Sequence, residues 1–170
     1  MIYIMIWFSI VGQRLIELWV ANRNERWMKE NGATIVEEGI YKWIVLTHVT
    51  FLMAILVEGY LFHHLQNKIT VFVLFLFLVL QVLRMWCLTS LGRFWNTKII
   101  VLPKVERIRK GPYKYVRHPN YIIVGLEFII IPILFHAYVS AVLFPLVHSV
   151  LMYYRIPAEE RALKNRRDII

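Results

Sequence analysis

Cysteine and charged residues are both scarce in this chain of 170 residues. Cys87 is the only cysteine, which excludes an intrachain disulfide and a cysteine-ligated metal cluster. Charged residues make up 18% and hydrophobic residues 59% of the chain, whereas soluble domains have about 25% and about 45–50%. Because the apolar residues are gathered in long blocks, the composition argues against a soluble domain and indicates an integral membrane protein.

Two further absences limit the kind of protein. Residues 1–20 have neither the basic leader nor the small-residue cleavage site of a signal peptide, so we expect a retained first span. The six histidines include no pair at the i, i+4 spacing of a helical metal site. We therefore expect no metal.

Five apolar segments predict an all-α integral membrane protein with about five transmembrane helices. The segments are 2–22, 41–63, 69–91, 121–136 and 138–155. The second and third are long enough to cross about 30 Å of hydrocarbon. The fourth and fifth are shorter, and the uncharged "FHAY" between them predicts a helical hairpin with kinks at Pro132 and Pro145. We expect one domain over 1–170, in which 1–91 form the first three spans and 92–170 form the rest.

The basic residues predict an orientation in the membrane. They lie in the first and third connections and in the tail, whereas the opposite side has only Lys68 and the uncharged turn. The positive-inside rule then places the N-terminus outside and the third connection and C-terminal tail in the cytoplasm. The net charge of +9 suits anionic lipid headgroups, and nucleic acid is not an expected partner.

The tail predicts a cytoplasmic C-terminal helix that starts at Pro157. Proline is favoured at the first helical position, and Glu159 and Glu160 follow in the first turn, where acids are stabilised by the helix dipole. Arg166 and Arg167 lie near the other end. These charges are explained equally well by a solvated helix and by a functional site.

Several ionisable residues fall inside the predicted spans, where they are costly and need partners. Arg14 and Glu17 are three residues apart, and we expect them to pair on one helix face. Arg84 could extend to the interface or face the interior. Glu58 lies near the end of the second span, where we expect it to reach the interface. Glu127 requires an interior partner, either an arginine or a cationic ligand.

The stretch "KGPYKYVRHPNYIIVGLE", residues 110–127, joins a basic loop directly to the fourth span. Gly111-Pro112 predicts a turn, and Pro119 disfavours the helical conformation at His118. The loop therefore presents three side chains near the start of the span, from Tyr113, His118 and Tyr121. Backbone donors at this helix start could hold a carboxylate. A belt of tyrosines and arginines at the membrane interface explains the same residues equally well.

The motif "GPYKYVRHPNY" before an apolar span, with "YYRIPAEERAL" after a hairpin, resembles the isoprenylcysteine carboxyl methyltransferase (ICMT) family of membrane enzymes. The upstream "LGRFWNTKI" is similar to bacterial members. The resemblance covers mainly 84–165, and the first three spans match only in hydropathy. It implies that S-adenosyl-L-methionine binds without a Rossmann domain, in a cytoplasmic pocket formed by the third loop, the next span and the C-terminal helix. The chain has no glycine-rich dinucleotide motif, which agrees with this implication.

The resemblance also implies site residues. The positions that match the cofactor loop and the tail acids are Tyr113, His118, Pro119, Tyr121, Glu159 and Glu160. Arg155 matches the arginine that the family places near the acceptor oxygen, so Arg155 and Glu160 are the catalytic candidates. Glu127 is a further candidate for the cationic cofactor. Acids, aromatic faces and helix-end donors suit a sulfonium with an amino-acid tail. Trp95 could pack on the cofactor or act as an interfacial anchor.

The expected acceptor is a lipophilic small molecule or lipid that arrives through the bilayer of a bacterial cell. Eukaryotic relatives methylate the carboxylate of a prenylated cysteine, and bacterial relatives are associated with amphipathic molecules such as long-chain alkylpyrones. We favour O-methylation of a carboxylate or an acidic enol or phenol, because these oxygens ionise without a strong general base. An upstream biosynthetic enzyme could supply the acceptor. The alternatives are a phospholipid-type N-methyltransferase, a much longer NADPH-dependent sterol reductase, and a non-catalytic small membrane protein.

Overall fold

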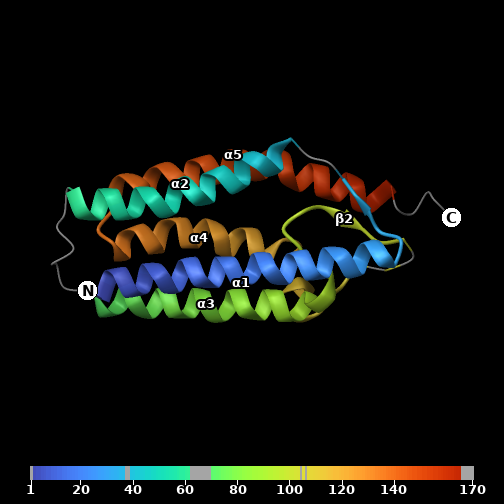
Figure 1. Ribbon diagram of the computed structural model, residues 1–170, viewed down its shortest axis with the longest axis horizontal. Coiled ribbons are helices and arrows are strands. Elements are labelled where there is room, and N and C mark those ends of the chain that lie inside the picture. The colour runs from blue at the N-terminus through green and yellow to red at the C-terminus, as the bar shows by residue number, and fades with distance from the viewer. Residues whose placement is uncertain (1, 37–38, 62–69, 104, 106, 166–170) are drawn as a thin grey trace.

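The computed structural model describes residues 2–36, 39–61, 70–103, 105 and 107–165 (Figure 1). Lys68, Arg166 and Arg167, which entered the predictions of orientation and tail, lie outside the described residues. The described residues form five α-helices: α1 (Ile2–Glu30), α2 (Ile40–Leu61), α3 (Val71–Leu91), α4 (Pro119–Leu134) and α5 (Tyr138–Asn165). Their number and order confirm the prediction of an all-α membrane protein. Four of them are long and apolar enough to span a membrane, and α4 is shorter.

The shortest helix, α4, is the centre of the bundle. It packs against α3 on one side and α5 on the other, and α5 also packs against α2. Figure 1 shows α1 and α3 along one side, α2 and α5 along the other, and α4 between them. Phe128 and Ile131 of α4 are almost completely buried in the apolar core together with Ile55 of α2. The apolar blocks therefore bury one face against α4, while many large apolar side chains remain exposed as expected for contact with lipid.

The connection between α4 and α5 is the tight helical hairpin that the sequence predicts. Pro132 lies inside α4 and Pro145 inside α5, so neither proline ends its helix. His136 adopts a left-handed conformation with φ 57°, and the Ala137 amide donates to the Pro132 carbonyl at 2.8 Å. This turn closes the hairpin within three residues.

Glu58 stabilises the start of α5, a buried role that the sequence analysis did not assign to it. Its carboxylate is buried and accepts hydrogen bonds from the Val139 and Ser140 amides at 2.7 and 2.9 Å. The Ser140 hydroxyl also donates to it, at 2.7 Å. A carboxylate at a helix N-terminus satisfies amides that have no partner within the helix and interacts favourably with the helix dipole.

The C-terminal helix is the continuation of α5 rather than a separate element. The helix runs through Pro157 as far as Asn165, whereas the sequence predicts a new start at Pro157. A proline inside a helix removes one backbone hydrogen bond, but it does not have to end the helix. The last turns of α5, which include Glu159 and Glu160, lie at the end of the bundle at which α1 and α3 also terminate.

Short elements close this end of the bundle. A 3-10 turn, η1 (Gly92–Phe94), follows α3, and a second, η2 (Gly111–Lys114), precedes α4. Strand β1 (Thr34–Ile35) pairs antiparallel with β2 (Ile100–Val101). We call this side, opposite the α4–α5 hairpin, the loop end.

Candidate cofactor-binding site

The turn η2 lies against the end of α3 because Gly111 has no side chain. Gly111 has φ 53°, and a Cβ added to it would lie 2.1 Å from the Ser90 hydroxyl and 3.0 Å from Trp86 Nε1. Any other residue would therefore be strained by its backbone and would clash with α3. The predicted Gly-Pro turn is confirmed, and its close approach fixes where Tyr113 lies.

His118 immediately precedes α4 and is not helical. Its φ and ψ are −131° and 59°, as the sequence predicts for the residue before Pro119. The helix begins at Pro119, two residues before the predicted fourth segment. The imidazole makes no capping hydrogen bond with its own helix. Instead its Nε2 lies 3.3 Å from Glu160 Oε1 and its Nδ1 lies 3.6 Å from Glu159 Oε2. The loop before α4 is thus joined to the last turns of α5.

Tyr121, in the first turn of α4, links Glu159 of the tail to Arg155. Its hydroxyl donates to Glu159 Oε2 at 2.6 Å, and its ring stacks on His118 with centroids 5.5 Å apart. Arg155 Nε donates to the Tyr121 hydroxyl at 3.3 Å. The structure therefore brings together five predicted site residues, which we call the loop-end cluster: His118, Tyr121, Arg155, Glu159 and Glu160.

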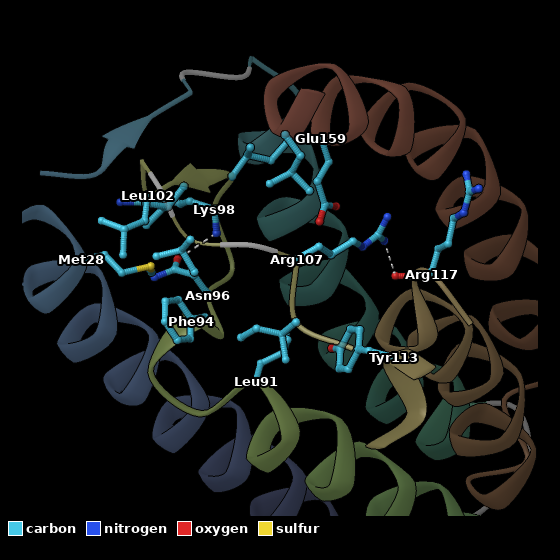
Figure 2. Close-up of a pocket in the computed structure, with 15 residues that line it drawn as sticks. Met28, Leu91, Phe94, Asn96, Lys98, Leu102, Arg107, Tyr113, Arg117 and Glu159 are labelled. Atoms are coloured by element: carbon cyan, nitrogen blue, oxygen red, sulfur yellow. Dashed lines mark hydrogen bonds between the residues drawn. The ribbon is translucent and has the colours of Figure 1, made fainter. Parts of the chain in front are cut away.

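A cavity of about 160 Å³ opens beside the loop-end cluster (Figure 2). Of the predicted residues, Tyr113 and Glu159 line it. Most of the rest of the wall is apolar, from residues that include Met28, Leu91, Phe94, Ile99, Leu102, Ile108 and Leu163. Partial burial raises the pKa of the Tyr113 phenol above its ordinary value, so this side chain stays neutral and can donate a hydrogen bond. The cavity combines an apolar wall with one acid.

Basic side chains also line the cavity, and sequence reasoning did not select them. Lys98 donates to Glu25 Oε2 of α1 at 2.8 Å, so its charge is compensated. Arg107 donates to the Arg117 carbonyl at 2.8 Å, and Figure 2 shows this bond across the loop. The Arg117 guanidinium lies 3.6 Å from Glu160. The basic composition of the third loop was the only sequence signal for these residues, and it does not distinguish one cation from another.

Arg155 is buried, with 3% of its surface exposed, and is not among the residues that line the cavity. Its Nη2 donates to the Thr97 carbonyl at 2.7 Å, so it also holds the segment that follows α3. Its assignment beside the acceptor oxygen stays a prediction.

Glu127 belongs to a second group of charges, deep among the helices. Its Oε2 accepts hydrogen bonds from Arg14 at 2.7 Å and Arg84 at 2.9 Å, and its Oε1 accepts one from Gln81 at 3.1 Å. Of the two partners that the sequence leaves open, the structure supplies arginines. Glu127 is 1% exposed and does not line the cavity at the loop end. Nothing in its contacts requires a cofactor.

The same group of charges includes the predicted pair of Arg14 and Glu17, which lie 3.1 Å apart, so this prediction is confirmed. Arg84 faces the interior, where its Nε and Nη2 both bond to the Glu17 carboxylate at 2.6 Å. The interior cluster therefore comprises Arg14, Glu17, Arg84 and Glu127 and joins α1, α3 and α4. Two acids balance two arginines.

Trp95 is buried, with 3% of its surface exposed, so it is not an interfacial anchor. It does not line the cavity, and its indole Nε1 has no hydrogen-bond partner among the described residues. Within the same residues, no group of three histidine, cysteine, aspartate or glutamate side chains could hold a metal ion.

Comparison with known proteins adds the chemical context. Residues 72–165 match the sequence model of the isoprenylcysteine carboxyl methyltransferase (ICMT) family, whose members are membrane methyltransferases that use S-adenosylmethionine. The chain is 40% identical over 163 residues to "Uncharacterized protein YpbQ" of Bacillus subtilis (strain 168), covering 94% of this chain and 97% of the relative. It is 25% identical over 167 residues to an "Uncharacterized protein" of Haemophilus influenzae, covering 97% of each. No solved structure matches.

Proposed function

The chain belongs to the ICMT family, and we propose that it transfers a methyl group from S-adenosylmethionine to an acidic oxygen of a lipophilic acceptor in the membrane. The observation that carries the proposal is the loop-end cluster beside the cavity. Two acids and an arginine from α5, a tyrosine from α4 and the histidine that precedes α4 lie together there, next to a largely apolar wall.

The chemistry of the cavity residues fits this cofactor. Glu159 suits its cationic sulfonium or ammonium group, and Arg107 suits its carboxylate. The apolar wall, which includes Phe94, suits its adenosine. A cavity of about 160 Å³ is smaller than the roughly 300–1,000 Å³ of typical small-molecule sites, so the cofactor would also extend past the rim.

When bound, the cofactor would supply a methyl group activated by the positive sulfur. The residues of the chain would bind and align, because methyl transfer is an in-line displacement that depends on the positions of acceptor, methyl and sulfur. Tyr121 and His118 hold Glu159 in place, at 2.6 and 3.6 Å respectively. Tyr113 adds a neutral donor, and the apolar wall would exclude water.

The acceptor would be an acidic oxygen, because methyl transfer to it needs no general base. His118 lies 3.3 Å from Glu160 and 3.6 Å from Glu159, and in this proposal these contacts hold the two acids in place. A carboxylate or an acidic enol or phenol is already ionised near neutral pH, so the protein does not have to remove a proton. We assign Arg155 to orienting this anion, for which a buried guanidinium is suited. A long-chain alkylpyrone is one acceptor of this kind, and an isoprenylcysteine carboxylate is another. An amine of a phospholipid is the alternative acceptor.

We further propose that the loop end faces the cytoplasm of a bacterial cell and that the N-terminus faces outward. The cofactor would then enter from the cytoplasm, and the acceptor would come from the bilayer or from an upstream biosynthetic enzyme. The basic residues at the loop end support this orientation, because positive charge is concentrated on the cytoplasmic side of membrane proteins.

Calorimetric titration of the detergent-purified protein tests the function. S-adenosylmethionine should bind saturably, and NADPH in a parallel titration should not. Binding of NADPH alone would replace the proposal with a reductase, and binding of neither would leave a non-catalytic membrane protein. With binding established, mass spectrometry of reactions with lipophilic acids, hydroxypyrones and phospholipid amines would distinguish O- from N-methylation.

A further inference from the structure

A wall of the cavity is built by the segment 92–101, which we call the strap. It leaves α3 at η1, crosses the loop end and ends in β2. It contributes five of the residues that line the cavity: Phe94, Asn96, Lys98, Ile99 and Ile100. Apart from the one turn of η1 and the two residues of β2 it has no regular structure, so its shape depends on contacts with other elements.

Helix α1 holds the strap through an asparagine that is buried at its loop end. The side-chain amide of Asn24 donates from Nδ2 to the Gly92 carbonyl at 3.1 Å and to the Trp95 carbonyl at 2.8 Å. Both amide hydrogens are thereby used on two carbonyls of one turn. Asn24 is 7% exposed, so water cannot readily replace these bonds.

Further contacts from α1 and β1 fix the same segment. Asn96 donates from Nδ2 to the Ala21 carbonyl at 2.9 Å, and Lys98 pairs with Glu25 at 2.8 Å. Strand β1 pairs with the end of the strap. Helix α1 also contributes to the cavity directly, because Met28 is one of its lining residues. All these contacts come from residues before 72, where the match to the family begins.

We propose that Asn24 is a positioning residue for cofactor binding, because it fixes the conformation of the strap and hence the cavity wall. The inference rests on the proposed function, since it concerns the same cofactor. Asn24 does not line the cavity, so it acts through Phe94, Asn96 and Lys98 and not by touching the ligand. The two hydrogen bonds of Asn24 fix the first turn of the strap, because they join the Gly92 and Trp95 carbonyls.

Loss of Asn24 should affect the strap more than the bundle. Helix α1 is also attached through the interior cluster, in which Arg14 and Glu17 bond to α3 and α4. The global unfolding temperature should therefore change little, while the Gly92 and Trp95 carbonyls lose their donors. This separation distinguishes a positioning role from a structural one.

The test compares Asn24→Ala with the wild type and with Asn31→Ala. Asn31 is a matched control near the same end of α1, because its Nδ2 also donates to a carbonyl at 2.7 Å, but this carbonyl belongs to Trp27 of α1 and not to the strap. Three quantities are measured: the Kd for S-adenosylmethionine, the unfolding temperature, and amide hydrogen exchange of peptides from 92–101. We expect Asn24→Ala to raise the Kd at least tenfold and to speed exchange in the strap, with both values unchanged in Asn31→Ala.

Each outcome decides between the proposals. An unchanged Kd in Asn24→Ala overturns the positioning role while the proposed function stands, because the wild type still binds. A wild type that does not bind S-adenosylmethionine overturns the proposed function itself. If Asn24→Ala does not fold, Asn24→Ser, which keeps one donor, is measured instead. Asn24→Ser should give an intermediate rise in Kd. If the Asn24 and Asn31 variants instead lose unfolding temperature and affinity to the same extent, the inference is overturned.

Discussion

The interior cluster and the loop-end cluster both contain two glutamates and arginine, but they differ in whether the glutamates remain accessible to a ligand. In the interior cluster all four carboxylate oxygens of Glu17 and Glu127 accept hydrogen bonds from arginine or glutamine. The void beside it has a volume of about 10 Å³, close to that of one water molecule. In the loop-end cluster, Glu159 is bonded to Tyr121 but also lines a cavity of about 160 Å³.

This difference shows that a buried acid in a membrane bundle indicates a ligand-binding site only if its hydrogen bonds within the protein leave it accessible to a ligand. Buried charges are costly in the bilayer and are retained when they are paired. Glu127 is fully paired, so its presence is explained by the joining of α1, α3 and α4. Glu159 and Glu160 keep access to the cavity or the surface, so they can still bind a ligand.

The largest expected effect comes from Arg84→Leu in the interior cluster. It removes one of the two arginines that pair with both acids and leaves Arg14 alone to balance them. Breaking a buried ion pair from one side costs about 3–5 kcal/mol, so we expect a loss of unfolding free energy of that order. Denaturant or thermal unfolding in detergent measures it. Arg109→Leu, at an exposed position, is the control, and a loss below about 1 kcal/mol in Arg84→Leu would contradict the structural role.

Glu127→Gln should lower stability without changing cofactor affinity. The substitution keeps the shape but leaves two arginines facing one acid, and a lost charged hydrogen bond is worth about 1.5–3 kcal/mol. Unfolding and S-adenosylmethionine titration are measured on the same preparation. A fall in affinity with little change in stability would return Glu127 to the cofactor site.

Glu159→Gln should show the opposite pattern. Loss of the negative charge at the cavity should raise the Kd for S-adenosylmethionine about tenfold, which corresponds to about 1.4 kcal/mol. The unfolding temperature should stay close to that of the wild type, because this side chain is only partly buried. Calorimetry provides the Kd, and Glu30→Gln at the exposed end of α1 is the matched control. If Glu159→Gln binds S-adenosylmethionine as tightly as Glu30→Gln does, Glu159 is not part of the cofactor site.

The smallest effect concerns Tyr113 at high pH. Burial raises the pKa of its phenol above the ordinary value of 10.0, so the unfolded chain releases this proton at a lower pH than the folded protein does. Its contribution to stability is therefore complete below about pH 10 and is lost as the pH rises further. Tyr113→Phe should reduce the loss of unfolding free energy between about pH 9 and about pH 11. An identical pH profile for both proteins would show that the phenol is not buried in solution.

The helices and part of the site could be predicted from the sequence because their signals are local. Hydropathy predicts five helices, the Gly-Pro pair predicts the turn, and the His-Pro pair predicts that His118 is not helical. The motifs around His118 and Glu159 select residues that the structure does bring together. These predictions depend on neighbouring residues in the chain.

The remaining contacts could not be predicted because they depend on how distant helices are rotated against each other. Glu58 reaches Val139, 81 residues further along the chain, and Arg14 reaches Glu127, 113 residues away. Hydropathy defines neither rotation nor register. The role of Asn24 was missed for the same reason, since one asparagine near a helix end gives no sequence signal of the carbonyls it will meet.

Hydrogen exchange measured with and without S-adenosylmethionine tests the central claim most directly, because it locates the ligand without requiring the acceptor. The account predicts slower exchange in peptides from 92–117 and 156–165 and no change in peptides around Glu17, Arg84 and Glu127. Protection centred on the interior cluster, with none at the loop end, would contradict the assignment of the cofactor site to the loop-end cluster.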